Sequence, residues 1–149
     1  MKRGRIFALA VALGFGAVAV PVVAKLATPE ATPARTASVD ATIELGEFFI
    51  KPPSDPLVAG QPYHFVIKNT GLVTHELVIE PAGAVDAPLE KNGHKAAVED
   101  ITKGQTKELT WTFDQPGDYE FACFVDDHYQ HGMLTKFTVI PADTGTPTG

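Results

Sequence analysis

A chain of 149 residues has the length of one domain, and a composition of 44% hydrophobic and 20% charged residues excludes a chain that is disordered throughout. The formal net charge of −6 argues against a nucleic-acid partner, because binding phosphates requires a basic surface. A lone cysteine, Cys123, rules out a disulfide within the chain.

The N-terminus has the pattern of an export signal. Basic residues in the first five positions are followed by an uncharged, apolar run over residues 6–24. We predict a signal peptide over residues 1–24, with an uncleaved membrane anchor as the alternative, because about 20 apolar residues can cross a bilayer. The membrane is a partner only if this segment is retained. Either outcome places the remaining chain in the periplasm or another extracytoplasmic space.

The segments at the two ends of the remaining chain are predicted to be unstructured. Residues 25–38 are rich in Ala, Thr and Pro without periodicity, which predicts a flexible spacer. Residues 142–149 form a tail rich in Thr and Gly that is predicted to be disordered. The folded domain is therefore expected to span residues 39–141.

Short β-type segments separated by turn residues make up this domain. We predict strands at residues 39–49, 63–69, 75–80, 106–113, 118–124 and 134–140. Short strands at this spacing predict an all-β sandwich or barrel. Because side chains alternate between the faces of a strand, His75 shares a face with Leu77 and Ile79. By the same count Cys123 shares a face with Phe121. One imidazole and the only thiol are therefore expected to point inward.

The core is predicted from the same alternation. Large apolar side chains occupy every second position of two predicted strands: Tyr63, Phe65, Ile67, Leu109, Trp111 and Phe113. The segment 81–103 breaks the pattern with prolines and glycines, which predicts a long excursion over one side of the fold with a short helical piece at residues 96–100. His64 and His94 lack partners at matching spacing and are expected to be ordinary surface or edge residues.

Residues 121–133 place a thiol, an imidazole and a thioether five positions apart, as Cys123, His128 and Met133. Thiolate and thioether suit Cu(I), imidazole suits both oxidation states of copper, and two His, one Cys and a weak axial Met form the ligand set of blue copper. The second imidazole must come from elsewhere, and His75 can supply it. A buried His or Cys taken singly is more often a core residue, but the joint spacing favours one copper ion.

Three pieces of the sequence carry a family resemblance: FVIKNTG at 65–71 with THEL at 74–77, FDQPGDYEFAC at 113–123, and the loop end at 128–133. Together they resemble the cupredoxin family, in particular small bacterial members related to plastocyanin and azurin. The resemblance covers residues 39–140 and implies a Greek-key β-sandwich with a metal site at one end. It also implies the ligands of one copper ion that alternates between Cu(I) and Cu(II): His75, Cys123, His128 and Met133.

Two places depart from the family pattern. Asp126 and Asp127 stand where many relatives have Pro-Gly before the second His ligand, and His131 stands where they have a small residue. The acidic pair is expected to stabilise Cu(II) and lower the reduction potential. His131 is the alternative to Met133 as the fourth ligand.

The leading functional prediction is a one-electron carrier, because four protein ligands leave no open copper position for a substrate. The alternative is periplasmic copper buffering or copper tolerance through the same site. An enzyme is not expected: Cys123 and His128 could form a thiolate–base pair or a hydrolytic zinc site, but no orienting residue accompanies them. The sequence identifies no redox partner, and we expect a monomer.

Overall fold

The structure is a computed structural model that describes residues 37–143. The predicted signal peptide, most of the predicted spacer and most of the predicted tail lie outside the described residues, and their limits stay predictions. The first strand begins at Val39 and the last ends at Ile140. Within residues 37–143, no helix is long and apolar enough to span a membrane.

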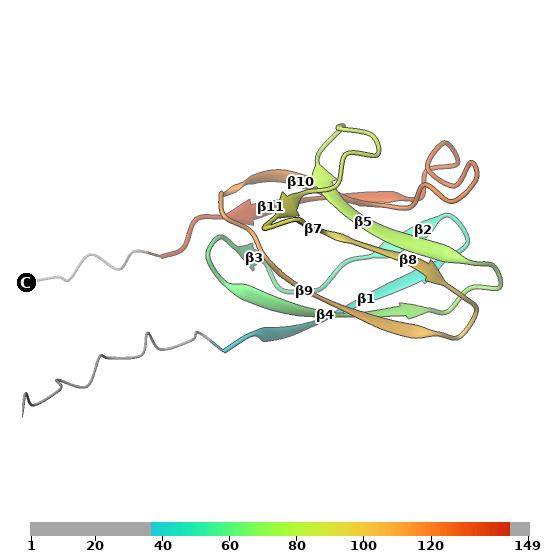
Figure 1. Cartoon of the computed structure of the whole chain (residues 1–149), viewed down its shortest axis with the longest axis horizontal. Coiled ribbons are helices and arrows are strands. Elements are labelled where there is room, and N and C mark those ends of the chain that lie inside the picture. Colours follow the sequence, from blue (N-terminus) through green and yellow to red (C-terminus); the bar gives the residue numbers. More distant parts are fainter. Residues whose placement is uncertain (1–36, 144–149) are drawn as a thin grey trace, which may run out of the picture. The chain divides into compact units, whose positions relative to one another are not determined.

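The first sheet contains four strands in the spatial order β2, β1, β4, β9 (Figure 1). Their bounds are Phe49–Lys51 for β2, Val39–Gly46 for β1, Pro62–Asn69 for β4 and Thr106–Thr112 for β9. β1 runs parallel to β4, whereas the β1–β2 and β4–β9 pairs are antiparallel. In β4, buried residues alternate with less buried ones, as expected for a strand with one face on a core.

The second sheet contains five strands in the order β3, β11, β10, β5, β8. Their bounds are Leu57–Val58 for β3, Leu134–Ile140 for β11, Gly117–Ala122 for β10, His75–Pro81 for β5 and Ala97–Ile101 for β8. A separate hairpin joins β6 (Glu90–Lys91) and β7 (His94–Lys95). The two sheets form a β-sandwich, which confirms the predicted fold class. Five of the six predicted strands are present as single strands, but the predicted strand at residues 39–49 is divided by a turn at residues 47–48 that separates β1 from β2.

The predicted helical piece at residues 96–100 is wrong, because this segment forms β8 instead. β8 pairs antiparallel with β5, with an irregular register between His75 and Leu77. Directly before β8, the Ala96 carbonyl accepts the Ile79 N–H at 2.9 Å. The edge of β5 thus obtains backbone partners that a helix could not supply, and this tertiary pairing outweighs the weak local helical preference.

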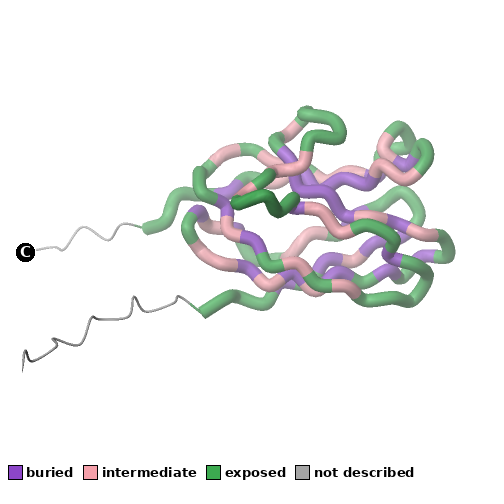
Figure 2. The backbone as a smooth tube through the Cα atoms, viewed as in Figure 1, coloured by how far each residue is buried: buried purple, intermediate pink, exposed green. Residues whose placement is uncertain are grey.

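The core lies between the two sheets (Figure 2). Its largest fully buried apolar side chains come from both sheets: Phe65, Phe113, Phe121, Ile43, Leu45, Ile67, Leu77, Ile79, Ile101 and Met133. Phe121 stacks on Phe137 at a centroid distance of 4.2 Å and meets Phe65 edge to face at 5.9 Å. Of the predicted core residues, only Leu109 is partly rather than fully buried. Burial of one such side chain contributes about 1.5–3 kcal/mol to folding.

The outer face of the second sheet carries two buried glutamates. Glu80 and Glu120 lie opposite each other on β5 and β10, and both are fully buried. The excursion after β5 covers them: the Ala87 N–H donates to Glu80 Oε2 at 2.6 Å and the Gly83 N–H donates to Glu120 Oε2 at 3.0 Å. Burial raises the pKa of Glu80, and the neighbouring Glu120 raises that pKa further. The excursion therefore covers one side of the sandwich, as predicted.

Candidate metal centre

Three of the four candidate ligands lie at strand ends of the second sheet, and the fourth lies in a loop between two of these strands. His75 is the first residue of β5, Cys123 directly follows β10, and Met133 directly precedes β11. His128 lies in the loop between β10 and β11, which Figure 1 shows at the same end of the domain as the start of β5. Because β5 and β10 are antiparallel neighbours, the start of one strand adjoins the end of the other.

The two imidazoles and the thiol converge on one point. Cys123 Sγ lies 3.4 Å from His128 Nδ1 and 4.0 Å from His75 Nδ1, and the ligand atoms of all three residues lie within 4.8 Å of one another. Nitrogen and sulfur ligands about 2.0–2.3 Å from one ion, at trigonal to tetrahedral angles, stand roughly 3.6–3.8 Å apart. The donor set therefore fits a single metal ion, and its mixture of thiolate and imidazole suits copper.

Backbone hydrogen bonds hold the loop that carries three of the candidates. The Cys123 N–H donates to the Met133 carbonyl at 3.1 Å, and the Met133 N–H donates to the His128 carbonyl at 2.9 Å. Met133 is fully buried and belongs to the core cluster, and 7% of His128 is exposed. The three residues are therefore fixed relative to one another by the fold, and only His128 presents an edge to solvent.

His131, the alternative fourth ligand, lies apart from this cluster. Its side chain is 55% exposed, and its Nε2 lies 2.9 Å from Asp127 Oδ2. Among the described residues, the group of clustered His, Cys, Asp and Glu side chains contains His75, Cys123 and His128 without His131. The imidazole of His131 is thus paired on the surface with Asp127, one of the two acidic residues that the sequence singled out.

Burial governs the protonation of the donors. Burial raises the pKa of the Cys123 thiol. Burial also lowers the pKa of His75, and the adjacent His128 lowers it further. In the metal-free protein these effects favour a neutral thiol and a neutral imidazole. A metal ion that takes the sulfur as a thiolate must therefore displace a proton.

Asn69 holds the loop that leads into His75. Its side-chain Nδ2 donates to the carbonyls of Val73 and Ile101, both at 2.7 Å, and its Oδ1 accepts the Gly71 N–H at 2.8 Å. The sequence predicted a turn here without this role for the buried amide. A buried Asn at the end of an apolar strand, followed by Thr and Gly, was the available signal.

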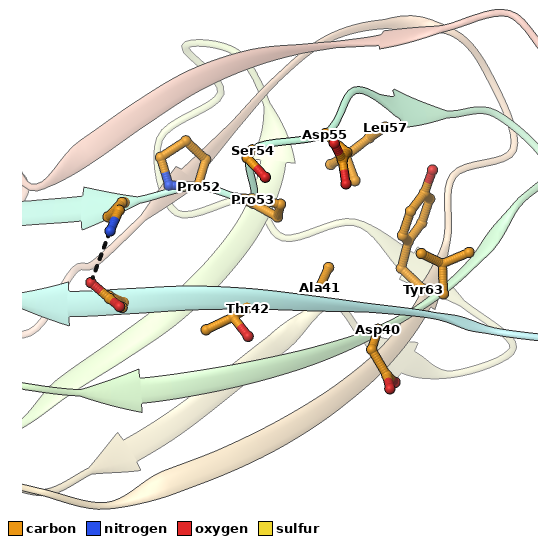
Figure 3. A pocket seen from close by; sticks show the side chains of 12 residues that line it. Asp40, Ala41, Thr42, Pro52, Pro53, Ser54, Asp55, Leu57 and Tyr63 are labelled. Carbon is orange, nitrogen blue, oxygen red and sulfur yellow. Dashed lines mark hydrogen bonds and ion pairs between the residues drawn. The ribbon is translucent and has the colours of Figure 1, made fainter.

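The cavity in Figure 3 is separate from the cluster. It measures about 370 Å³ and lies between β1 and the segment that follows β2. Its charged lining comprises Asp40, Glu44, Lys51 and Asp55, and Lys51 Nζ lies 3.4 Å from Glu44 Oε2. Because the clustered donors do not line this cavity, a molecule bound there would not reach them.

Comparison with known proteins agrees with this geometry. The family described as cupredoxin-like domain matches residues 16–135. The copper-resistant cuproprotein CopI of Pseudomonas aeruginosa is 29% identical over 147 residues, covering 73% of this chain and 81% of that protein. CopI of Rubrivivax gelatinosus is 30% identical over 88 residues, covering 54% of this chain and 53% of that protein.

A solved structure adds a likeness in three dimensions. The Na-dithionite reduced auracyanin of Roseiflexus castenholzii matches with a TM-score of 0.56 and 27% identity, covering 70% of this chain and 99% of that one. The family match spans most of the chain, and the clustered donors suit copper. The chain therefore belongs to the cupredoxin-like family and is a copper-binding β-sandwich protein.

Proposed function

We propose that this protein is an exported one-electron carrier. Its single copper ion would be held by two imidazoles, one thiolate and one thioether: His75, Cys123, His128 and Met133. The convergence of the first three donors within 4.8 Å is the observation that carries the proposal. The predicted export signal supports a periplasmic or other extracytoplasmic location.

The rigidity of the site supports electron transfer. Copper supplies the one-electron step when bound, and the protein's part is to hold similar ligand positions in both oxidation states. The backbone hydrogen bonds that link Cys123, His128 and Met133 resist movement of the loop. A complete protein ligand set leaves no position for a substrate, so we assign no enzymatic turnover.

His128 is the proposed exit for the electron. Its exposed edge lies beside Phe48, whose ring centroid is 5.5 Å away. Phe48, Leu72 and Val73 are exposed apolar side chains at this end of the domain. An apolar surface around a partly exposed ligand suits brief contact with a redox partner protein. The identity of that partner is left open.

A second candidate function is copper tolerance or copper buffering through the same site. It is favoured by the relatives, which are named copper-resistant cuproproteins. Buffering requires tight binding but no fast electron exchange, whereas a carrier requires both oxidation states to remain bound. The two functions therefore differ in how the loaded protein behaves over repeated redox cycles.

A redox titration followed by absorption spectroscopy tests the proposal. For a carrier, copper addition should give strong visible absorption that disappears on reduction and returns on oxidation, without loss of copper over repeated cycles. Release of copper on oxidation would favour buffering. A colourless protein that binds zinc more tightly than copper would contradict both functions.

A further inference from the structure

The turn between β1 and β2 contacts both candidate imidazoles from outside the cluster. Glu47 Oε1 lies 3.7 Å from His75 Nε2, and the Phe48 ring packs edge to face on His128. Phe48 has a φ of 61°, a left-handed conformation that bulky residues rarely adopt. A strained turn that directs adjacent side chains to two proposed ligands indicates a functional constraint on this turn.

Glu47 is fixed in place by a second loop. Its Oε1 accepts the N–H of Leu72 and, at 3.2 Å, the N–H of Val73. At Gly71 a Cβ atom would lie 2.5 Å from Glu47 Oε1, so the glycine makes room for the carboxylate. Hydrogen bonding from the Leu72 N–H lowers the pKa of Glu47, although partial burial opposes this effect. The N–H groups of Leu72 and Val73 therefore hold the carboxylate beside His75.

His75 needs an acceptor at the nitrogen that faces Glu47. Its Nδ1 faces Cys123 Sγ, and its Nε2 is buried and lacks a hydrogen-bond partner within the described part of the chain. If Nδ1 binds a metal, Nε2 carries the ring proton, because a neutral imidazole has one donor and one acceptor nitrogen. At 3.7 Å from Nε2 the Glu47 carboxylate is just beyond hydrogen-bonding distance, so the proposal requires this gap to close when a metal is bound.

We infer that Glu47 is a positioning residue for the copper site: its carboxylate accepts the His75 Nε2 proton and thereby presents Nδ1 to the copper. The inference rests on the proposed role of His75 as a ligand. A carboxylate behind a metal-binding imidazole fixes the ring orientation and the tautomer and makes the ligand more basic. Its negative charge also stabilises Cu(II) relative to Cu(I), which lowers the reduction potential.

Substitution of Glu47 tests this role against a matched control. Glu47→Ala removes the acceptor, and Glu47→Gln keeps a neutral acceptor of the same shape. Glu44→Gln makes the same charge change as Glu47→Gln, three residues earlier on β1, but Glu44 pairs with Lys51 instead. We expect Glu47→Ala to weaken copper binding about 10- to 100-fold, Glu47→Gln to weaken it less and raise the potential, and Glu44→Gln to change neither.

The state of the His75 ring is the second readout. In the copper(I) protein, which is diamagnetic, NMR should show a hydrogen-bonded His75 Nε2 proton that persists in Glu44→Gln and is lost or shifted in Glu47→Ala. If Glu47→Ala lowers only thermal stability, and leaves this signal, the affinity and the potential unchanged, Glu47 merely holds the loop and the inference is wrong.

A His75→Ala variant separates this inference from the proposed function. Copper affinity that is unchanged in His75→Ala would overturn the proposed ligand set itself. Affinity that falls in His75→Ala but not in Glu47→Ala or Glu47→Gln would overturn only the role of Glu47. These measurements use binding and NMR of the full chain, so they remain decisive even if redox cycling proves irreversible.

Discussion

Two of the histidines that lie beside carboxylates differ in their surroundings: His75 lies at the metal end and His64 on the outer face of the first sheet. His75 is fully buried, and burial lowers its pKa although Glu47 is 3.7 Å away. The side chain of His64 is 30% exposed and lies between Asp40 at 2.9 Å and Glu108 at 3.3 Å. The hydrogen bond with Asp40 is the main cause that raises the pKa of His64.

The difference shows that a nearby carboxylate alone does not decide what a histidine does. Where water is excluded, the desolvation cost of the charged ring outweighs the carboxylate, and the neutral imidazole is free to bind a metal. Where water remains, the carboxylates of the neighbouring strands β1 and β9 prevail and raise the pKa of the ring on β4. The region around His75 should thus change when copper binds, and the protonation of His64 should change with pH.

Removing the Cys123 thiol should have the largest effect on the copper spectrum, and this effect should be confined to the metal end. We expect Cys123→Ser to abolish the visible copper band, because the strong absorption arises from the copper–thiolate bond, while circular dichroism keeps the β-sandwich signature. His64→Gln, the control at the other region, should leave the band unchanged. A Cys123→Ser protein that stays coloured would show that the proposed ligand set is wrong.

The fourth ligand can be identified by comparing two substitutions in one loop. A thioether binds weakly along the axis, so Met133→Leu should keep the colour and raise the reduction potential by on the order of tens of millivolts. His131→Ala should change the spectrum and the potential little, because its ring is paired with Asp127. The reverse result, with a strong spectral shift only in His131→Ala, would assign the ligand to His131.

The acidic pair tests how far charge at the metal end acts on copper. Replacing Asp126 and Asp127 by Asn should raise the potential by on the order of tens of millivolts at low salt, because negative charge stabilises Cu(II), and salt should reduce the effect. Asp126 should contribute more, since Asp127 pairs with His131. Asp40→Asn makes the same charge change beside His64 and should leave the potential unaltered. If Asp40→Asn shifted the reduction potential as much as the replacement of Asp126 and Asp127, the effect of charge would not be local to the metal end.

The smallest expected effect is the pH response of His64. Because its pKa is raised in the folded state, its contribution to the free energy of unfolding is fully present below the unfolded pKa of about 6.5 and is lost as pH rises through the folded pKa. Urea unfolding of the metal-free protein across this window should therefore show stability falling slightly with pH. His64→Gln should reduce the slope of the free energy of unfolding against pH. An unchanged slope in that variant would show that another group causes the pH dependence.

Spacing and alternation along the sequence were enough to predict the β-sandwich and the candidate copper ligands. The five-residue steps from Cys123 to His128 to Met133 lie within one loop, and the alternation around His75 indicated an inward-facing imidazole. The structure brings His75, Cys123 and His128 together. The sequence predicted this grouping from the ligand types that copper prefers, because contacts between distant residues are not visible in a sequence.

Long-range contacts account for what the sequence did not predict. The strand predicted at residues 39–49 includes Glu47, but this residue lies in a turn, where its carboxylate accepts an N–H group from a loop 25 positions away. The surroundings of His64 depend on Asp40 and Glu108, which come from two other strands. β8 was mistaken for a helix because its strand pairing is supplied by β5. Each of these features is set by tertiary neighbours that periodicity does not encode.

The short pairing of β1 with β2 has a consequence for aggregation. β2 pairs only with the stretch from Glu44 to Gly46, so the first part of β1 has an edge that β2 does not cover. Pro52 and Pro53 follow β2 directly and line the cavity beside that edge (Figure 3). Proline has no N–H with which to extend the sheet. The two prolines thus end β2 early and stand beside the part of β1 that β2 leaves unpaired, where they hinder the strand of a second molecule from joining the sheet.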